Sequence, residues 1–209
     1  MGTDLEKFSW IVERSEALRP NFDVPVLETE DFVVLPSLGS LVAGWVLIIP
    51  RRAMPNLSML SPREQRELTA LEERLTQALT PFGGKLYAFE HGGPYGSVVN
   101  CGVDQAHLHL VPLQFDLFAE ALSSKEIEWQ TLPRFSSIVP EPQSDEYLSV
   151  ASLYDGRVAF GRPIMPQSQW FRKLIAQTLN VGTWDYKSFP EIPVIHQTAH
   201  VLSGAANDR

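Results

Sequence analysis

Apolar and turn-forming residues along the first half of the chain follow a pattern that predicts strands. Residues 26–35, 45–49, 85–90 and 106–111 are rich in β-branched and aromatic side chains and are bounded by turn formers. The stretch at 46–49 is apolar without alternation, which indicates a strand buried on both faces. We expect these strands to form one antiparallel sheet.

Two helices are predicted in the same half. Residues 5–17 carry apolar side chains near helical spacing, which predicts a docked N-terminal helix, with a partner-binding helix as the alternative. Further along, Ser61 suits an N-cap, Pro62 suits the first helical position and Glu64 completes a capping box. The apolar stripe that follows consists of Leu68, Leu71, Leu75, Ala78 and Leu79. We therefore expect a helix over residues 61–79 that packs on the core.

The second half of the chain has a mixed pattern. The predicted elements are a short helix at 116–123, a hairpin with strands at 147–154 and 157–160 around Asp155-Gly156, and a helix at 169–179. The expected fold class is α+β: an antiparallel sheet with packed helices, plus a C-terminal extension that contains a β-hairpin and a helix. We divide the chain into residues 1–113 and an extension, residues 114–209, that packs on the first part.

Composition narrows the classes of function. The chain has 209 residues, of which 44% are hydrophobic, enough for a sizeable core. A net charge of −8 argues against duplex nucleic acid as a partner, because such a partner needs a basic surface. No apolar run is long enough to span a bilayer, and the acidic N-terminus differs from a signal peptide. The single cysteine, Cys101, cannot form an internal disulfide, which favours a cytoplasmic location.

One predicted strand carries the candidate chemistry. Side chains two apart in a strand point to the same face, so Gln105, His107 and His109 are expected to form a polar row. The alternate residues are Ala106, Leu108 and Leu110, which are expected to point into the core. By contrast, His196 and His200 lie four apart near the C-terminus without a third metal ligand, and we interpret them as surface residues.

The stretch Gln105-Ala106-His107-Leu108-His109-Leu110-Val111 resembles the motif of the histidine triad (HIT) family, in which three histidines alternate with apolar residues. The order of the upstream elements is similar too, so the resemblance covers roughly residues 23–113, about half the chain. The first histidine of the motif is replaced by Gln105. The resemblance implies a HIT-like antiparallel sheet and makes residues 1–113 a nucleotide-binding and catalytic domain.

The resemblance also implies roles for the row. His107, at the middle position, is expected to attack the α-phosphorus of a nucleotide conjugate and form a nucleotidyl-histidine intermediate. His109 is expected to hydrogen-bond the phosphoryl or leaving-group oxygens. Gln105 is expected to donate a hydrogen bond to the phosphate or to orient a neighbour, since an amide carries no proton that titrates at neutral pH. The implied substrate is a small nucleotide conjugate, such as a dinucleoside polyphosphate or a phosphoramidate, and no cofactor or metal is expected.

Three further residues are candidate substrate contacts. Asn100 and Gly102 precede the row closely enough for amide groups to reach a phosphate, although an asparagine here also suits a turn. His91 begins a glycine-rich stretch, and the alternative for it is an ordinary loop histidine.

Two rival functions stay open. The first is a nucleotide-binding protein that has lost catalysis, which the glutamine at position 105 motivates. The second is a zinc-dependent hydrolase that binds the metal through His107, His109 and His91, because histidines two apart on a strand are a common metal arrangement. The oligomeric state is also open: HIT proteins are often homodimers, but the extension could cover that interface.

Overall fold

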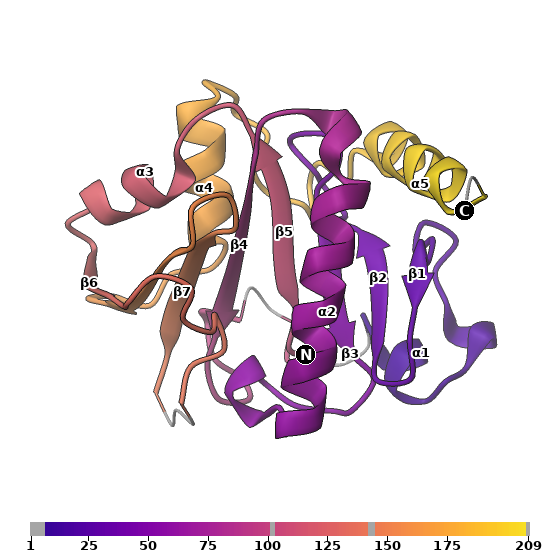
Figure 1. The fold of residues 1–209 in the computed structure, drawn as a ribbon, viewed down its shortest axis with the longest axis horizontal. Coiled ribbons are helices and arrows are strands. Elements are labelled where there is room, and N and C mark those ends of the chain that lie inside the picture. The colour runs from indigo at the N-terminus through magenta and orange to yellow at the C-terminus, as the bar shows by residue number, and fades with distance from the viewer. Residues whose placement is uncertain (1–6, 101–102, 142–144, 208–209) are drawn as a thin grey trace.

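One antiparallel sheet organises the molecule in a computed structural model that describes residues 7–100, 103–141 and 145–207. These residues form an eight-stranded sheet in the order β1-β2-β3-β5-β4-β7-β8-β6, with helices on both faces (Figure 1). The strands are β1 (Leu27–Glu28), β2 (Phe32–Pro36), β3 (Val46–Pro50), β4 (Lys85–Gly92), β5 (Leu108–Leu113), β6 (Ile127–Thr131), β7 (Tyr147–Ser152) and β8 (Arg157–Pro163). The predicted α+β class with an antiparallel sheet and packed helices is confirmed.

Helices complete the two layers around the sheet. They are α1 (Ser9–Val12), α2 (Pro62–Ala78), α3 (Leu117–Ser123), α4 (Trp170–Thr178) and α5 (Ile192–Asn207). Short 3-10 turns are found at η2 (Glu16–Leu18), η3 (Leu57–Met59) and η4 (Thr80–Phe82). None of the described helices is both long and apolar enough to cross a membrane.

The long helix α2 begins where the sequence predicts. The Ser61 side chain accepts a hydrogen bond from the Glu64 amide, and the Glu64 carboxylate accepts one from the Ser61 amide, so the capping box is present. The buried stripe of α2 packs on one sheet face, where it meets Ile48, Ala88 and Leu110. This layer forms the part of the core between α2 and the sheet.

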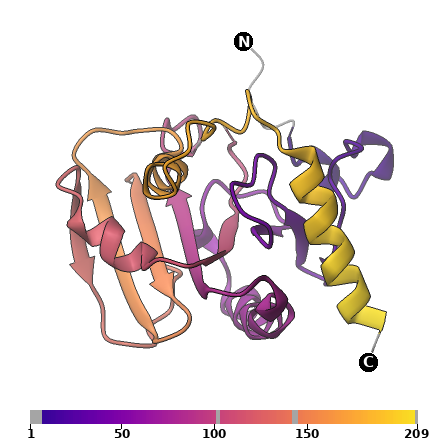
Figure 2. The same ribbon diagram turned by 90° about the horizontal axis from the view of Figure 1, so that it is seen from above.

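The opposite sheet face is covered by segments from both halves of the chain. Phe89, Val111 and Val150 point to this side and pack with Phe171 and Ile175 of α4. Figure 2 shows α2 and α4 on opposite sides of the sheet. The face that carries the histidines is therefore a covered face.

Three local predictions differ from the structure. Residues 26–35 form two strands instead of one, because the Thr29 hydroxyl accepts a hydrogen bond from the Phe32 amide and closes a turn between β1 and β2. The N-terminal helix is only four residues long, since the chain turns away at Arg14, whose φ is +52°. The β7–β8 turn has four residues, because Ser152 pairs with Arg157.

The extension continues the sheet of the first half. β7 pairs with β4 from Tyr87↔Ser152 to Gly92↔Tyr147, and β8 and β6 follow. The predicted hairpin and both predicted helices of the extension are present as β7–β8, α3 and α4. The boundary drawn at residue 113 therefore falls between strands that belong to the same sheet.

A chain ended after Gln114 should be insoluble or fail to melt cooperatively. It loses β6–β8 and α3–α5, which exposes the hydrogen-bonding edge of β4 and the apolar face around Phe89. The measurement is size-exclusion chromatography with thermal unfolding. As a control, a chain ended after Glu191 lacks only α5, keeps the whole sheet and should stay folded with a lower melting temperature. A monomeric, cooperatively melting fragment of residues 1–114 contradicts the prediction.

Candidate functional site

Three histidines meet on the sheet face opposite α2. His109 lies in β5, His91 lies in the neighbouring strand β4, and His107 directly precedes β5. The ring centroids of His107 and His109 are 4.9 Å apart, and those of His91 and His109 are 6.1 Å apart. The predicted row thus exists for His107 and His109, and the structure adds His91. That residue belongs to β4 and not to the predicted loop, because β4 continues to Gly92 through its pairing with β7.

The hydrogen bond of His107 assigns its tautomer. Its Nδ1 lies 2.8 Å from the backbone oxygen of Gln105. A carbonyl oxygen only accepts hydrogen bonds, so Nδ1 carries the proton and donates. In the neutral ring the Nε2 atom therefore has a free lone pair, which is the form that a nucleophile or a general base needs.

His109 has the opposite tautomer. The indole Nε1–H of Trp45 donates to Nδ1 of His109 at 3.0 Å. An indole nitrogen donates only, so Nδ1 of His109 is unprotonated and the proton of the neutral ring lies on Nε2. Phe89 stacks on the same ring at 4.4 Å with an interplanar angle of 11°, which restrains its orientation. His109 is thus a hydrogen-bond donor through Nε2.

His91 is bound by the start of α4. The backbone amide of Phe171 donates to its Nε2 at 3.2 Å, so the proton of the neutral ring lies on Nδ1. Within the described residues this buried Nδ1 has no hydrogen-bond partner. His91 therefore joins the extension to the histidine row.

Burial keeps all three rings neutral. Burial lowers the pKa of His91 to about 3 and that of His107 to about 4, and it lowers the pKa of His109 well below the usual 6.5. The positive charge of Arg172 adds to this effect at all three rings, and that of Lys7 does so at His107 and His109. These cations lie far from the motif in sequence, and no pattern in the sequence placed them here.

The Gln105 side chain is bonded to neighbouring backbone groups, which agrees with the expected alternative of orienting a neighbour. Its Nε2 donates to the backbone oxygens of Pro50 and Arg52 at 2.8 and 3.0 Å, and its Oε1 accepts from the Met54 amide at 3.3 Å. Both amide hydrogens are thus used, and neither is free for a phosphate. The physical reason is that β5 begins at Leu108, so Gln105 precedes the strand and lies beside the segment after β3. Gln105 orients that segment, and its backbone oxygen orients His107.

Asn100 is buried in the loop between β4 and β5. Its Nδ2 donates to the backbone oxygen of Pro94 at 3.0 Å and reaches Oδ1 of Asp104 at 3.4 Å, so it organises the loop. Its Oδ1 has no hydrogen-bond partner among the described residues. Gly102, the remaining predicted contact, lies outside the described residues, as does Cys101.

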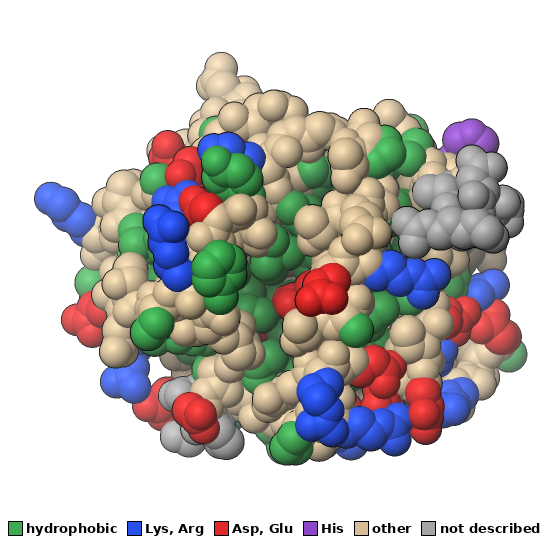
Figure 3. Space-filling view, viewed as in Figure 1, with side chains coloured by type: hydrophobic (Ala, Val, Ile, Leu, Met, Phe, Trp, Pro, Cys, Tyr) green, Lys and Arg blue, Asp and Glu red, His purple; other side chains and the backbone are tan. Residues whose placement is uncertain are grey.

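The N-terminal segment covers the row. The Phe8 ring contacts His107 edge-on at a centroid distance of 5.9 Å. The exposed fraction is 8% for His107 and 5% for each of His109 and His91. A cavity of about 150 Å³ beside the row is lined by Phe8, Ser9, Val12, Glu13, Ala53 and Gln105. Seen from the α2 side, a histidine is exposed at the end of the molecule that carries α5 (Figure 3). His196 and His200 of that helix are both exposed, as predicted.

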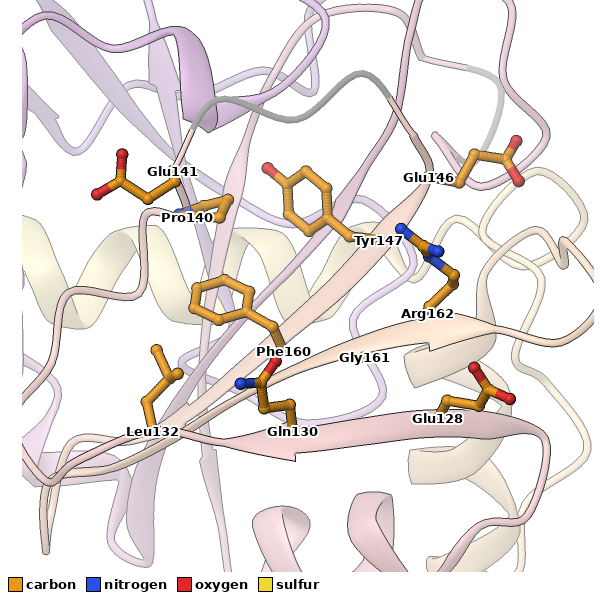
Figure 4. A pocket seen from close by; sticks show the side chains of 10 residues that line it. All are labelled: Glu128, Gln130, Leu132, Pro140, Glu141, Glu146, Tyr147, Phe160, Gly161 and Arg162. Atoms are coloured by element: carbon orange, nitrogen blue, oxygen red, sulfur yellow. The ribbon is translucent and has the colours of Figure 1, made fainter.

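A larger cavity of about 450 Å³ opens on the other face of the sheet, over the extension. Figure 4 shows the rings of Tyr147 and Phe160 next to each other in the lining, with Gln130 beside Phe160 and Arg162 to one side. The Tyr147 hydroxyl donates at 2.6 Å to the buried carboxylate of Glu90, whose pKa burial raises to about 7. Glu90 precedes His91 in β4 and points to the opposite face, so this cavity is separate from the histidine row.

The zinc site considered from the sequence finds no support in the geometry. Within residues 7–100, 103–141 and 145–207, no three histidine, cysteine or acidic side chains are placed to hold a metal ion. One nitrogen each of His91 and His109 already accepts an N–H bond.

Comparisons with known proteins find likeness only among solved structures: no family model and no curated protein matches the sequence. A Hit-like protein involved in cell-cycle regulation from Bartonella henselae is 16% identical, with a TM-score of 0.41 over 50% of this chain and 74% of that one. A hypothetical histidine triad nucleotide-binding protein from Sulfolobus tokodaii is 13% identical, with a TM-score of 0.39 over 93% and 92%. A DUF4931 family protein from Bacillus cereus is 10% identical, with a TM-score of 0.45 over 86% and 100%.

Acid should destabilise the protein through its buried histidines. Their folded-state pKa values lie below the unfolded value of about 6.5, so between about pH 4 and 6.5 the unfolded chain binds more protons. Their contribution is complete above about pH 6.5 and falls as the pH drops, by up to about 1.4 kcal/mol per pH unit for each ring. Urea unfolding at several pH values measures this slope.

Two variants separate the effect from that of carboxyl groups. His91→Gln keeps an acceptor for the Phe171 amide but does not titrate, so its slope should be smaller. The matched control is His196→Gln, the same substitution at an exposed histidine outside the row. Equal slopes for the parent and His91→Gln contradict the prediction.

Gln105→Leu should destabilise the protein by roughly 2–4 kcal/mol, because it removes three hydrogen bonds and leaves the buried Pro50 carbonyl and Met54 amide without this partner. Denaturant unfolding at neutral pH measures this loss. Gln77→Leu, on the exposed side of α2, is the matched control and should change stability by less than about 0.5 kcal/mol. A Gln105→Leu variant as stable as the control shows that these hydrogen bonds contribute little.

Proposed function

We propose that this protein is a nucleotidyl hydrolase or transferase of the HIT type, which acts at the α-phosphate of a nucleotide conjugate. The observation that carries the proposal is the pair of complementary tautomers on neighbouring rings. His107 has a free lone pair on Nε2, His109 has its proton on Nε2, and the ring centroids are 4.9 Å apart. A nucleophile next to a hydrogen-bond donor is the arrangement that phosphoryl transfer through a covalent intermediate needs.

The proposed reaction has two steps. In the first, Nε2 of His107 attacks the α-phosphorus, a P–N bond forms, and the bond from phosphorus to the leaving group breaks. His109 hydrogen-bonds the leaving-group oxygen or a phosphoryl oxygen through its Nε2–H and keeps its proton, and the leaving group departs with the electron pair of the broken bond. In the second step, water or phosphate attacks the same phosphorus, the P–N bond breaks, His107 regains its Nε2 lone pair, and the proton of an attacking water passes to solvent.

The surroundings of His107 suit this chemistry. Its low pKa keeps the ring unprotonated at neutral pH, so the nucleophile is available without prior loss of a proton. When Nε2 is bonded to phosphorus the ring becomes cationic, and its Nδ1–H then donates a stronger hydrogen bond to the Gln105 carbonyl. The charges of Arg172 and Lys7, which act on the rings, favour an anionic ligand.

A nucleotide-binding protein without turnover is the second candidate. Two observations favour it: His107 is only 8% exposed beneath Phe8, and the amide of Gln105 is fully engaged with backbone groups. This candidate predicts binding of a nucleotide without release of product.

The remaining expectations on partners and location belong to the same proposal. We infer a small-molecule nucleotide ligand, such as a dinucleoside polyphosphate or a phosphoramidate, and no duplex nucleic acid, because the net charge is −8. The single cysteine favours a cytoplasmic location. A homodimer stays an open alternative for the oligomeric state.

His107→Ala should lower turnover more than about a thousandfold, because it removes the nucleophile. The assay incubates the purified protein with a panel of nucleotide conjugates and measures release of nucleoside monophosphate. With a labelled slow substrate, acid quenching should leave acid-labile label on His107 of the parent. His196→Ala, at an exposed histidine of α5, is the control and should keep parent activity.

The outcomes separate the two candidates. Full activity in His107→Ala excludes the covalent route through this residue. Nucleotide binding by the parent without turnover on any conjugate supports the second candidate instead.

A further inference from the structure

Trp45 directly precedes β3 and is fully buried beside the histidine row. Besides its hydrogen bond to His109, its ring meets His109 edge-on at 5.8 Å and Phe89 at 5.7 Å. The indole therefore has both a directed polar contact and a packed position. Trp45 lies far upstream of the stretch Gln105–Val111, so that stretch does not indicate that Trp45 contacts the row.

Arg172, from α4 of the extension, lies over the ring of Trp45. The guanidinium carbon is 4.6 Å from the centroid of the indole ring, within the range of a cation–π contact. The same guanidinium donates to the backbone oxygens of Gly39 and Leu38 at 2.5 and 2.6 Å, and to the Ser37 hydroxyl at 2.7 Å. These bonds fix the cation and, through it, the face of the indole.

The N-terminal end of α4 thus contacts one histidine directly and acts on a second through Trp45. The Phe171 amide bonds His91 directly, and Arg172 restrains Trp45, which bonds His109. Trp170, the first residue of α4, instead bonds Glu126 in the extension. The two residues that follow it carry the polar contacts to the site.

We propose that the C-terminal extension sets the hydrogen-bonding state of the row through Trp45: Arg172 holds the indole, the indole Nε1–H occupies Nδ1 of His109, and His109 stays a neutral Nε2–H donor. Trp45 and Arg172 are then positioning residues for the proposed reaction. The inference rests on the proposed function for its catalytic consequence, whereas the state of the His109 ring can be measured independently.

The basic nitrogen of His109 is already engaged by the Trp45 indole. A neutral imidazole has one lone pair that can take a proton, and in His109 the Trp45 N–H occupies it. Protonation therefore requires that the ring give up this hydrogen bond in a buried site, which disfavours the charged form. The charged and titratable groups that act on His109 from the surrounding elements are His107, His91, Arg172 and Lys7. None of them is acidic, so they too favour the neutral ring.

The catalytic consequence concerns the leaving group. If His109 keeps its proton on Nε2 across the working pH range, it always offers a hydrogen-bond donor where negative charge develops on the leaving group. Such a donor is effective because it is positioned before the reaction. If Trp45 serves only to fill space, a ring of similar size without the N–H should act equally well. Trp45→Phe tests this difference.

The first measurement uses the parent protein. In 15N-labelled protein, the His109 ring nitrogens should show bare Nδ1 and protonated Nε2 across pH 5–8, a window set by the usual imidazole pKa of about 6.5. A scalar coupling across the hydrogen bond should connect Trp45 Nε1 with Nδ1 of His109. This needs neither a variant nor a substrate. An Nδ1-protonated His109, or no such coupling, overturns the proposal.

The second measurement uses variants. Trp45→Phe should raise the pKa of His109 by about one unit or more, equivalent to a hydrogen bond of about 1.4 kcal/mol. It should also lower kcat about tenfold, change KM little and add an ionisation to the pH–rate profile. Arg172→Lys keeps the charge but loses the planar fork, so its effect should have the same direction and smaller size.

The control is Trp10→Phe. Trp10 is also a buried tryptophan whose Nε1–H is bonded, but its partner is Asp23 and not a histidine. This variant should leave the titration of His109 unchanged. An unchanged titration of His109 in Trp45→Phe overturns the proposal. If the titration shifts but the parent turns over no conjugate, the proposed function fails while the role of Trp45 stands.

Discussion

The structure depends on keeping three buried imidazoles neutral on one face of a sheet. A charged ring in a site without water costs several kcal/mol unless a counter-charge is present. Each ring here has one nitrogen bound to a fixed neutral partner: the Gln105 carbonyl, the Trp45 indole or the Phe171 amide. These partners determine the tautomers, and the tautomers make two chemically similar rings an acceptor and a donor.

The partners come from distant parts of the chain, so the site needs the whole sheet. The indole directly precedes β3, and the amide belongs to α4, which packs over β4. That helix is in place because β7 pairs with β4 and brings the extension onto the histidine face. The extension is therefore part of the site and also covers apolar surface that would otherwise meet water.

The glutamine in the motif has a structural explanation. Two backbone carbonyl groups and one amide meet beside β3, at Pro50, Arg52 and Met54. A glutamine amide has two N–H donors and an acceptor, so it satisfies all three, whereas a neutral imidazole has only one donor and one acceptor. The residue that departs from the histidine motif is thus matched to its backbone neighbours.

The sequence by itself determined the strands at β3, β4 and β5, the capped helix α2, the hairpin of the extension and the adjacency of His107 and His109. Each of these follows from local pattern, since strand alternation and helix capping depend on residues a few positions apart. Only the tertiary structure decided the placement of His91, the partners of Gln105 and the contacts of Trp45 and Arg172. Such contacts join residues that are far apart in the chain. Which of these residues meet depends on the order of the strands in the sheet, where β4 pairs with both β5 and β7. No local sequence pattern encodes that order.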